Sequence, residues 1–275
     1  MTSFATAFPA HPAASLRRGF ELTKWYIDVV APDGRGAIAH WVELSWHGVR
    51  GRAGSILTFG PNQPTEEHTA LEPGDAPPWH GQTLDWTMPA LGTTVLLQRR
   101  TAGAAIRLLG ELDGSLDWNC VAPHAPACIT VNGRSFDGVG YAECLRTSLP
   151  PWRLPAHSVR WGRALFRERS VVWLQWLGAE PRDVLLLDGH QVAGAIYADR
   201  IDLPHGEHLS LGARHVIREG GIAEAVRPAR VLWPLLPQAL REIRERKWLA
   251  RARLHAADGQ DEDSWAIHEQ ISLRP

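Results

Sequence analysis

Short turn-forming pairs recur along this chain at the spacing of β-strands. Asp-Gly and Asn-Gly pairs supply the positive φ angles that tight hairpins need. They occur at Asp33-Gly34, Asp113-Gly114, Asn132-Gly133, Asp188-Gly189 and Asp258-Gly259. Between them lie runs rich in Val, Ile, Leu and Trp, among them 22–30, 37–46, 93–98, 171–177 and 265–273. The pattern predicts an all-β protein built from antiparallel strands.

One short helix is expected near the C-terminus. Pro237 can take the first helical position, and Leu240, Ile243 and Lys247 would then share one face. The basic segment 241–253 is interrupted by glutamates, which is typical of a solvated helix face that runs into a strand. The Pro-rich stretches 60–78 and 150–155 are interpreted as connections, the first a candidate flap and the second a candidate crossover between two halves.

Composition excludes several classes of protein. The formal net charge of −1 provides no basic surface for nucleic acid. The three cysteines form no C-x-x-C pair and are odd in number, which favours a reducing, cytoplasmic compartment. No window reaches the run of about 18 apolar residues that a transmembrane segment needs.

Alternation in the first predicted strand separates two faces. A period of two places Trp25, Ile27 and Val29 on one face, and Tyr26 and Asp28 on the other. If the Trp25 face is core, the second face meets either solvent or a polar-lined cavity. We expect Tyr26 and Asp28 to face a cavity and not bulk water.

Familiar catalytic motifs are missing. The chain has no G-x-S-x-G elbow, phosphate-binding loop or H-E-x-x-H helix, and Gly138-Val-Gly140 runs into Tyr141 instead of completing a dinucleotide fingerprint. His205, Glu207 and His208 lie in a turn flanked by Pro and Gly, so no metal site is predicted there.

Carboxylates among aromatic residues are the remaining chemical signal. The chain contains 13 Trp, which must fill a core or line a pocket. On a strand, Tyr141 and Glu143 share one face. Desolvation among indole rings would raise the pKa of Glu143 and make it a candidate proton donor. The alternative is that Glu143 pairs with Arg160 or Arg163 and fastens two strands.

Short motifs along the chain carry a family resemblance. They are Trp25-Tyr-Ile-Asp28 followed by Asp33-Gly34, the segments 116–123, 129–133 and 151–155, Gly138-Val-Gly-Tyr-Ala-Glu143, Arg160-Trp-Gly-Arg163, and Trp265-Ala-Ile-His-Glu269. Together they resemble the motifs of the AttH-like, carotenoid 1,2-hydratase (hydroxyneurosporene synthase) and tocopherol-cyclase superfamily. One departure follows Glu143, where this chain continues Cys144-Leu-Arg-Thr-Ser-Leu-Pro instead of moving toward an Asn and a Trp-Gly or His-Gly pair.

The resemblance implies two lipocalin-like antiparallel β-barrels packed side by side, here assigned to residues 1–135 and 136–275. Members of the superfamily hydrate carotenoid double bonds, cyclise prenylated quinols or promote pericyclic ring closure, and many relatives have no assigned activity. Position by position, the resemblance implicates Asp28, Tyr141, Glu143 and Trp161.

These observations predict a cofactor-independent cyclase, isomerase or hydratase that acts on a hydrophobic, isoprenoid or polyketide-like substrate. Glu143, Asp28 and Tyr141 are the predicted catalytic residues. The predicted substrate-binding residues are Tyr26, Trp41, Trp118, Trp161, Trp173, Trp176 and Arg163. A non-catalytic carrier of an apolar small molecule is the main alternative, and a scaffold whose barrels are filled with Trp is a third.

Overall fold

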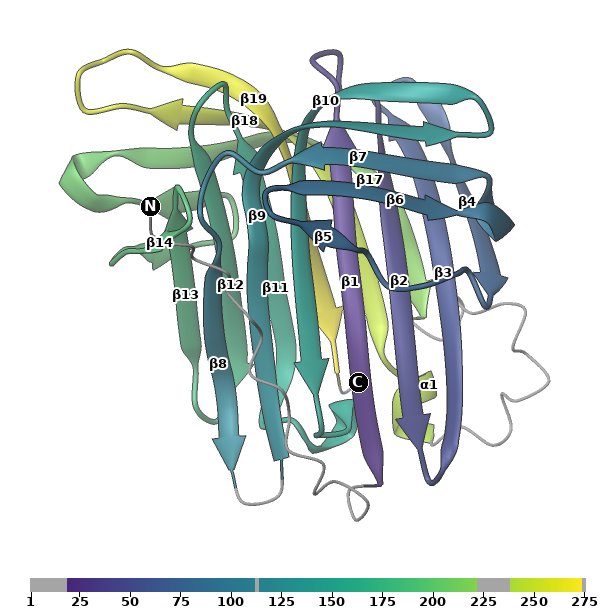
Figure 1. Ribbon diagram of the computed structural model, residues 1–275. Coiled ribbons are helices and arrows are strands. Elements are labelled where there is room, and N and C mark those ends of the chain that lie inside the picture. The colour runs from purple at the N-terminus through teal and green to yellow at the C-terminus, as the bar shows by residue number, and fades with distance from the viewer. Residues whose placement is uncertain (1–18, 112–113, 222–237, 274–275) are drawn as a thin grey trace, which may run out of the picture.

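The computed structural model describes residues 19–111, 114–221 and 238–273, which fold into two antiparallel sheets (Figure 1). The first sheet runs in the order β4 (Gln63–Leu71), β3 (Val49–Gly60), β2 (Gly36–Trp46), β1 (Phe20–Val30), β10 (Arg134–Thr147), β9 (Gly114–Val131), β7 (Thr93–Gln98), β6 (Thr83–Met88) and β5 (Trp79–His80), and β8 (Ala104–Glu111) also pairs with β9. The strands β6 and β7 cross over β1–β3, so this sheet curls around its own core (Figure 1).

The second sheet is built from the C-terminal half. Its order is β14 (His190–Gln191), β13 (Arg182–Leu187), β12 (Ser170–Gly178), β11 (Ala156–Leu165), β19 (Glu262–Ser272), β18 (Arg244–His255), β17 (His208–Gly221), β16 (Arg200–Asp202) and β15 (Ala195–Ile196). In Figure 1 its green and yellow strands lie behind the purple and teal strands of the first sheet. The predicted all-β fold with two barrel-like sheets is confirmed.

Three hydrophobic clusters follow from strand alternation. One lies inside the first sheet and includes Trp25, Ile27 and Val29 of β1. A second lies inside the second sheet. The third contains residues of both sheets, including Tyr26 of β1 and Trp161 of β11, and forms the interface between them. Alternate residues of β1 therefore enter different cores.

The hairpin signals are found where expected. Both Asn132 (φ 48°) and Gly133 (φ 81°) have positive φ angles in the two-residue turn from β9 to β10, as a type I′ turn requires. Asp188 (φ 52°) and Gly189 (φ 78°) do the same between β13 and β14. Asp113 lies outside the described residues.

Of the two Pro-rich stretches that were predicted to be connections, one connects the sheets and the other does not remain a single connection. Residues 148–155, which contain the 3-10 turn η2 (Pro151–Arg153), carry the chain from the first sheet to the second, as the crossover interpretation predicted. The expected boundary at residues 135/136 falls inside β10, and the division into two domains stays a prediction. The stretch 60–78 is not one connection, because it contains β4. The other 3-10 turns are η1 (Pro89–Leu91) and η3 (Pro204–Gly206).

The C-terminal helix is shorter than predicted. The helix α1 spans only Gln238–Arg241, and β18 begins at Arg244; Pro237 lies outside the described residues. The expectation that Lys247 continues a solvated helix face is wrong, because its side chain is 0% exposed in β18. Pairing with β17 and β19 takes the segment into the sheet, and alternation then points Lys247 at the first sheet.

Candidate functional site

Asp28 and Arg163 join the two sheets by a buried ion pair. Both side chains are 0% exposed. Nε of Arg163 donates to Oδ2 of Asp28 at 3.1 Å, and Nη2 donates to Oδ1. The remaining nitrogen, Nη1, donates to the Trp265 carbonyl at 3.2 Å. This two-bond pair between β1 and β11 joins the two sheets, so Asp28 has a structural role in the interface.

Glu143 lies on the same face of the first sheet but has neutral partners. The indole Nε1 of Trp118 donates to Glu143 Oε2 at 2.6 Å, and the Tyr141 hydroxyl donates to the same oxygen at 2.7 Å. Burial raises the pKa of Glu143, although the bonds from Trp118 and Tyr141 and the charge of Lys24 oppose the increase. The side chain keeps partial exposure. Glu143 therefore has the electrostatics of a carboxylic acid that holds its proton longer than a surface glutamate.

The alternative role for Glu143 is wrong. Arg163 binds Asp28, and Arg160 donates to Gln175 Oε1 at 3.3 Å. Neither of these arginines fastens Glu143 to a neighbouring strand. The ion pair with an arginine that the sequence left open for Glu143 is formed by Asp28 instead.

Aromatic rings surround this part of the interface. The ring of Trp161 lies 4.9 Å from that of Tyr26 and 5.5 Å from that of Tyr141, measured between centroids. Among the described residues, no hydrogen bond reaches the buried Tyr26 hydroxyl or the Trp161 indole nitrogen. The pKa of Tyr26 is raised by burial and by the nearby charge of Asp28. Trp176 belongs to the same interface cluster.

Sequence reasoning missed Lys247, which lies in this interface. Its Nζ is 2.7 Å from Glu269 Oε2, 3.2 Å from Glu245 Oε1 and 4.8 Å from the centre of the Tyr26 ring. Burial alone would raise the pKa of Glu245, but Lys247 and Arg218 together lower it to about 2. The alternation of charges in 244–247 was the available signal, because in a strand it places Glu245 and Lys247 on one face.

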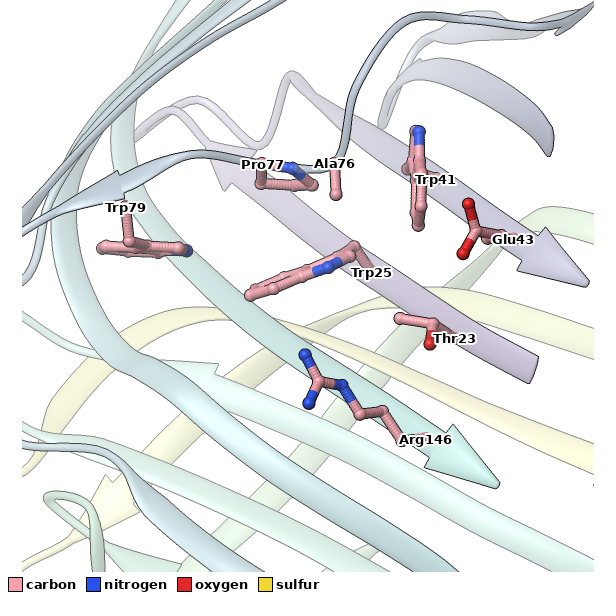
Figure 2. A pocket seen from close by; sticks show the side chains of 8 residues that line it. All are labelled: Thr23, Trp25, Trp41, Glu43, Ala76, Pro77, Trp79 and Arg146. Carbon is pink, nitrogen blue, oxygen red and sulfur yellow. The ribbon is translucent and has the colours of Figure 1, made fainter. Parts of the chain in front are cut away.

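The other predicted binding residues lie elsewhere. Trp41 lines a cavity of about 380 Å³ on the inner face of the first sheet, which we call the N-terminal cavity. Its lining, shown in Figure 2, consists of Thr23, Trp25, Trp41, Glu43, Ala76, Pro77, Trp79 and Arg146. Trp173 lines a smaller cavity of about 70 Å³ on the inner face of the second sheet. The structure thus brings together Tyr26, Asp28, Trp118, Tyr141, Glu143, Trp161, Trp176 and Arg163 in the interface and separates Trp41 from them, whereas Trp173 lines its small cavity together with Trp161.

The histidine turn is held by an ion pair. Glu207 accepts two hydrogen bonds from Arg169, at 3.0 and 2.7 Å, and His208 stacks on His255 with 4.2 Å between ring centroids. In the described part of the chain, no group of three or more His, Cys, Asp and Glu side chains is arranged to hold a metal ion. The helices described there include none long and apolar enough to cross a membrane.

Comparison with known proteins gives matches among solved structures only. No protein-family model and no curated protein sequence matches the chain. The crystal structure of CghA with Sch210972 matches with a TM-score of 0.53 and 10% identity, covering 93% of this chain and 89% of CghA. A candidate AttH from Nitrosomonas europaea matches with a TM-score of 0.52 and 11% identity, covering 98% of this chain and 100% of that protein.

The chain has the AttH-like fold. The resemblance first drawn from short motifs is therefore confirmed at the level of the fold. At about one identical residue in ten, the AttH-like fold is what the matches share with this chain, and the chemistry must be argued from its own side chains.

Proposed function

We propose that this protein is an enzyme of the hydratase, cyclase or isomerase kind, and that it protonates a hydrophobic substrate from the carboxyl of Glu143. The observation that carries the proposal is the raised pKa of Glu143, together with its two neutral hydrogen-bond donors. The complex of CghA with Sch210972 supports it, because there the same fold holds a small molecule.

In the proposed mechanism the two carboxyl oxygens of Glu143 have different tasks. Trp118 and Tyr141 both donate to Oε2, so Oε1 is the oxygen that carries the proton. The Oε1–H bond breaks as the π electrons of a substrate double bond or enol form a new C–H bond. The carboxylate left behind is stabilised by the two donors already in place.

The cation formed on the substrate meets aromatic rings. Tyr26, Tyr141 and Trp161 lie close together in the interface, and ring faces stabilise a positive charge. Water can capture the cation and give a hydration product, or a second double bond of the same substrate can close a ring. In each case the proton released at the end returns to Glu143, so the acid is regenerated.

The test compares wild type, Glu143→Gln and Glu66→Gln in deuterated water with a panel of prenylated quinols and acyclic isoprenoid alkenes. Glu66 is an exposed glutamate of β4 in the same sheet and serves as the matched control. Wild type and Glu66→Gln should incorporate deuterium at carbon, with product identified by mass spectrometry. Glu143→Gln should lose about 100-fold or more in kcat, the usual contribution of a general acid.

The pH profile gives a second readout. The acid must be protonated, so kcat/KM of wild type should fall as the pH rises through the raised pKa of Glu143. Full activity of Glu143→Gln would refute the proposal.

A carrier function is the second candidate. The N-terminal cavity favours it, because about 380 Å³ lies within the usual volume range of small-molecule sites and Glu143 does not line it. Saturable binding of panel compounds without turnover would select this candidate over the enzyme.

A further inference from the structure

We propose that the N-terminal cavity is a second ligand site, specific for a flat apolar molecule that carries one anionic group such as a carboxylate. The site is independent of the acid chemistry at Glu143, because the two lie on opposite faces of the first sheet. Alternation in β10 points Glu143 toward the second sheet and Arg146 into the cavity.

The apolar walls come from two different parts of the first sheet. Trp25 and Trp41 are directly paired neighbours on β1 and β2. Ala76, Pro77 and Trp79 face them from the connection between β4 and β5 and from the start of β5 (Figure 2). Indole rings on two sides of one cavity provide stacking surfaces for a flat ring system.

The connecting segment is held in place before any ligand binds. Nε1 of Trp41 donates to the Gly74 carbonyl at 3.0 Å, and Nε1 of Trp86 donates to the Asp75 carbonyl at 2.9 Å. Nη1 of Arg52 adds a bond to the Asp75 carboxylate at 3.3 Å. A wall tied down in this way reduces the ordering cost of binding.

Charge at the polar end favours an anion. Among the described residues that line the cavity, Glu43 is the one carboxylate, and it already binds two arginines, with Nη2 of Arg50 at 2.5 Å and Nε of Arg52 at 2.8 Å. Figure 2 shows the guanidinium of Arg146 below the Trp25 ring, on the cavity side. Arg146 lines the same cavity, and its guanidinium has five N–H donors in a planar fork, so it can bind a ligand carboxylate in addition to the contacts it already makes.

A hydrogen-bond donor is also available at the opposite end. The indole nitrogen of Trp79 is buried and has no hydrogen-bond partner among the described residues. In Figure 2 it is the edge of Trp79 nearest to Trp25. A buried N–H without a partner costs stability, so a ligand oxygen that accepts from it gains affinity.

Three naphthalene probes test the inference by isothermal titration calorimetry at pH 7. They are 2-naphthoate, the neutral 2-naphthol and the cationic 2-naphthylmethylamine. We expect 2-naphthoate to bind about tenfold tighter than 2-naphthol, as one charge-assisted hydrogen bond predicts, and the amine to bind most weakly. Arg146→Gln should abolish the preference for the acid, while Arg146→Lys should keep part of it.

Matched variants locate the site. Trp79→Ala should weaken all three probes, whereas Arg35→Gln, which removes an exposed arginine from the turn between β1 and β2, should leave every affinity unchanged. Glu143→Gln should also leave 2-naphthoate affinity unchanged, so loss of the acid chemistry and loss of this site are separate results.

A second measurement protects the test against misfolding. In protein labelled with 5-fluorotryptophan, the ¹⁹F resonance that disappears in Trp79→Phe belongs to Trp79, and it should shift when 2-naphthoate is added to wild type. No preference for 2-naphthoate, or a preference that survives in folded Arg146→Gln, overturns the inference.

Discussion

The two faces of β1 and β10 differ in how their charges are used. Toward the second sheet, Asp28 is bound by Arg163 of that sheet, whereas Glu143 is bound by Trp118 of its own sheet. On the opposite face, Trp25 and Arg146 border a cavity of about 380 Å³. One alternating sequence therefore places polar interface groups on one face of the sheet and an aromatic cavity on the other.

The closed face contains a second contrast, between two carboxylates that look alike in sequence. Asp28 is bound by a guanidinium, whereas Glu143 is bound by an indole and a phenol. Asp28 has a charged partner from the other sheet, whereas the donors to Glu143 are neutral and burial raises its pKa. The partner, more than the burial, decides which carboxylate is a fastener and which is a candidate acid.

The largest expected effect comes from Asp28→Asn. The change leaves the Arg163 guanidinium buried without its counter-charge, which should cost about 3–5 kcal/mol of unfolding free energy, or roughly 10 °C in Tm. Urea unfolding measures it. Asp33→Asn, which alters an exposed pair with Arg35, is the control and should behave as wild type. If Asp28→Asn loses only a little unfolding free energy, Asp28 and Glu143 do not differ in structural role as argued above.

Lys247→Met should produce the next largest loss of unfolding free energy, about 3 kcal/mol. The reason is that Glu269 and Glu245 lose the cation that they share. Arg218 still pairs with Glu245. The neighbouring Arg246→Met is the control, since Arg246 points to the opposite, exposed face of β18.

Acid should reduce the difference between Lys247→Met and wild type. The pKa of Glu245 is lowered to about 2 from an ordinary 4.5, so the stability this carboxylate provides is present above pH 4.5 and is lost as the pH falls toward 2. Thermal melts across that window should show the two proteins converging. If the Tm values of the two proteins instead stay equally far apart at every pH, Lys247 does not stabilise the ionised glutamates.

Glu143→Gln should have the smallest effect on stability and is the sharpest test of the contrast. The amide oxygen can accept the bonds from Trp118 and Tyr141, and the substitution removes a carboxyl group whose pKa is raised by burial. At pH 7 the Tm should be unchanged or higher, with Glu66→Gln as the control.

The direction of this change in Tm follows from the raised pKa of Glu143. The folded state holds the proton more tightly than the unfolded state, so wild-type stability falls as the pH rises from 4.5 through the raised value. Glu143→Gln should lack this fall. A drop of several degrees at pH 7 would contradict the candidate-acid role, because it would mean that the charged carboxylate of Glu143 stabilises the fold.

The local sequence pattern was sufficient to predict the strands and which residues share a face of each strand. Alternation in 24–29 separated Trp25 from Tyr26, and the Asn132-Gly133 pair marked its hairpin. These features depend on neighbours in sequence, where steric and turn preferences act directly.

Partners distant in the chain could not be predicted in this way. Asp28 and Arg163 are 135 residues apart, and nothing near Asp28 distinguishes it from Glu143. Trp41 was predicted to bind substrate together with Tyr26 and Trp161, but its pairing with Trp25 places it on the cavity side, away from them. Lys247 matched the helical period of Leu240 and Ile243, but strand pairing from Arg244 onward took precedence over that period.

The separation of Asp28 from Arg163 also has a consequence during synthesis on the ribosome. At about 5–20 residues per second, the 135 residues between them take roughly 7–27 s to translate. Until then the first half carries an unpaired Asp28 and an uncovered aromatic surface around Tyr26. The indole of Trp265, which donates to the Pro32 carbonyl at 3.2 Å, arrives later still. The nascent first half is therefore the form of this protein most in need of a chaperone.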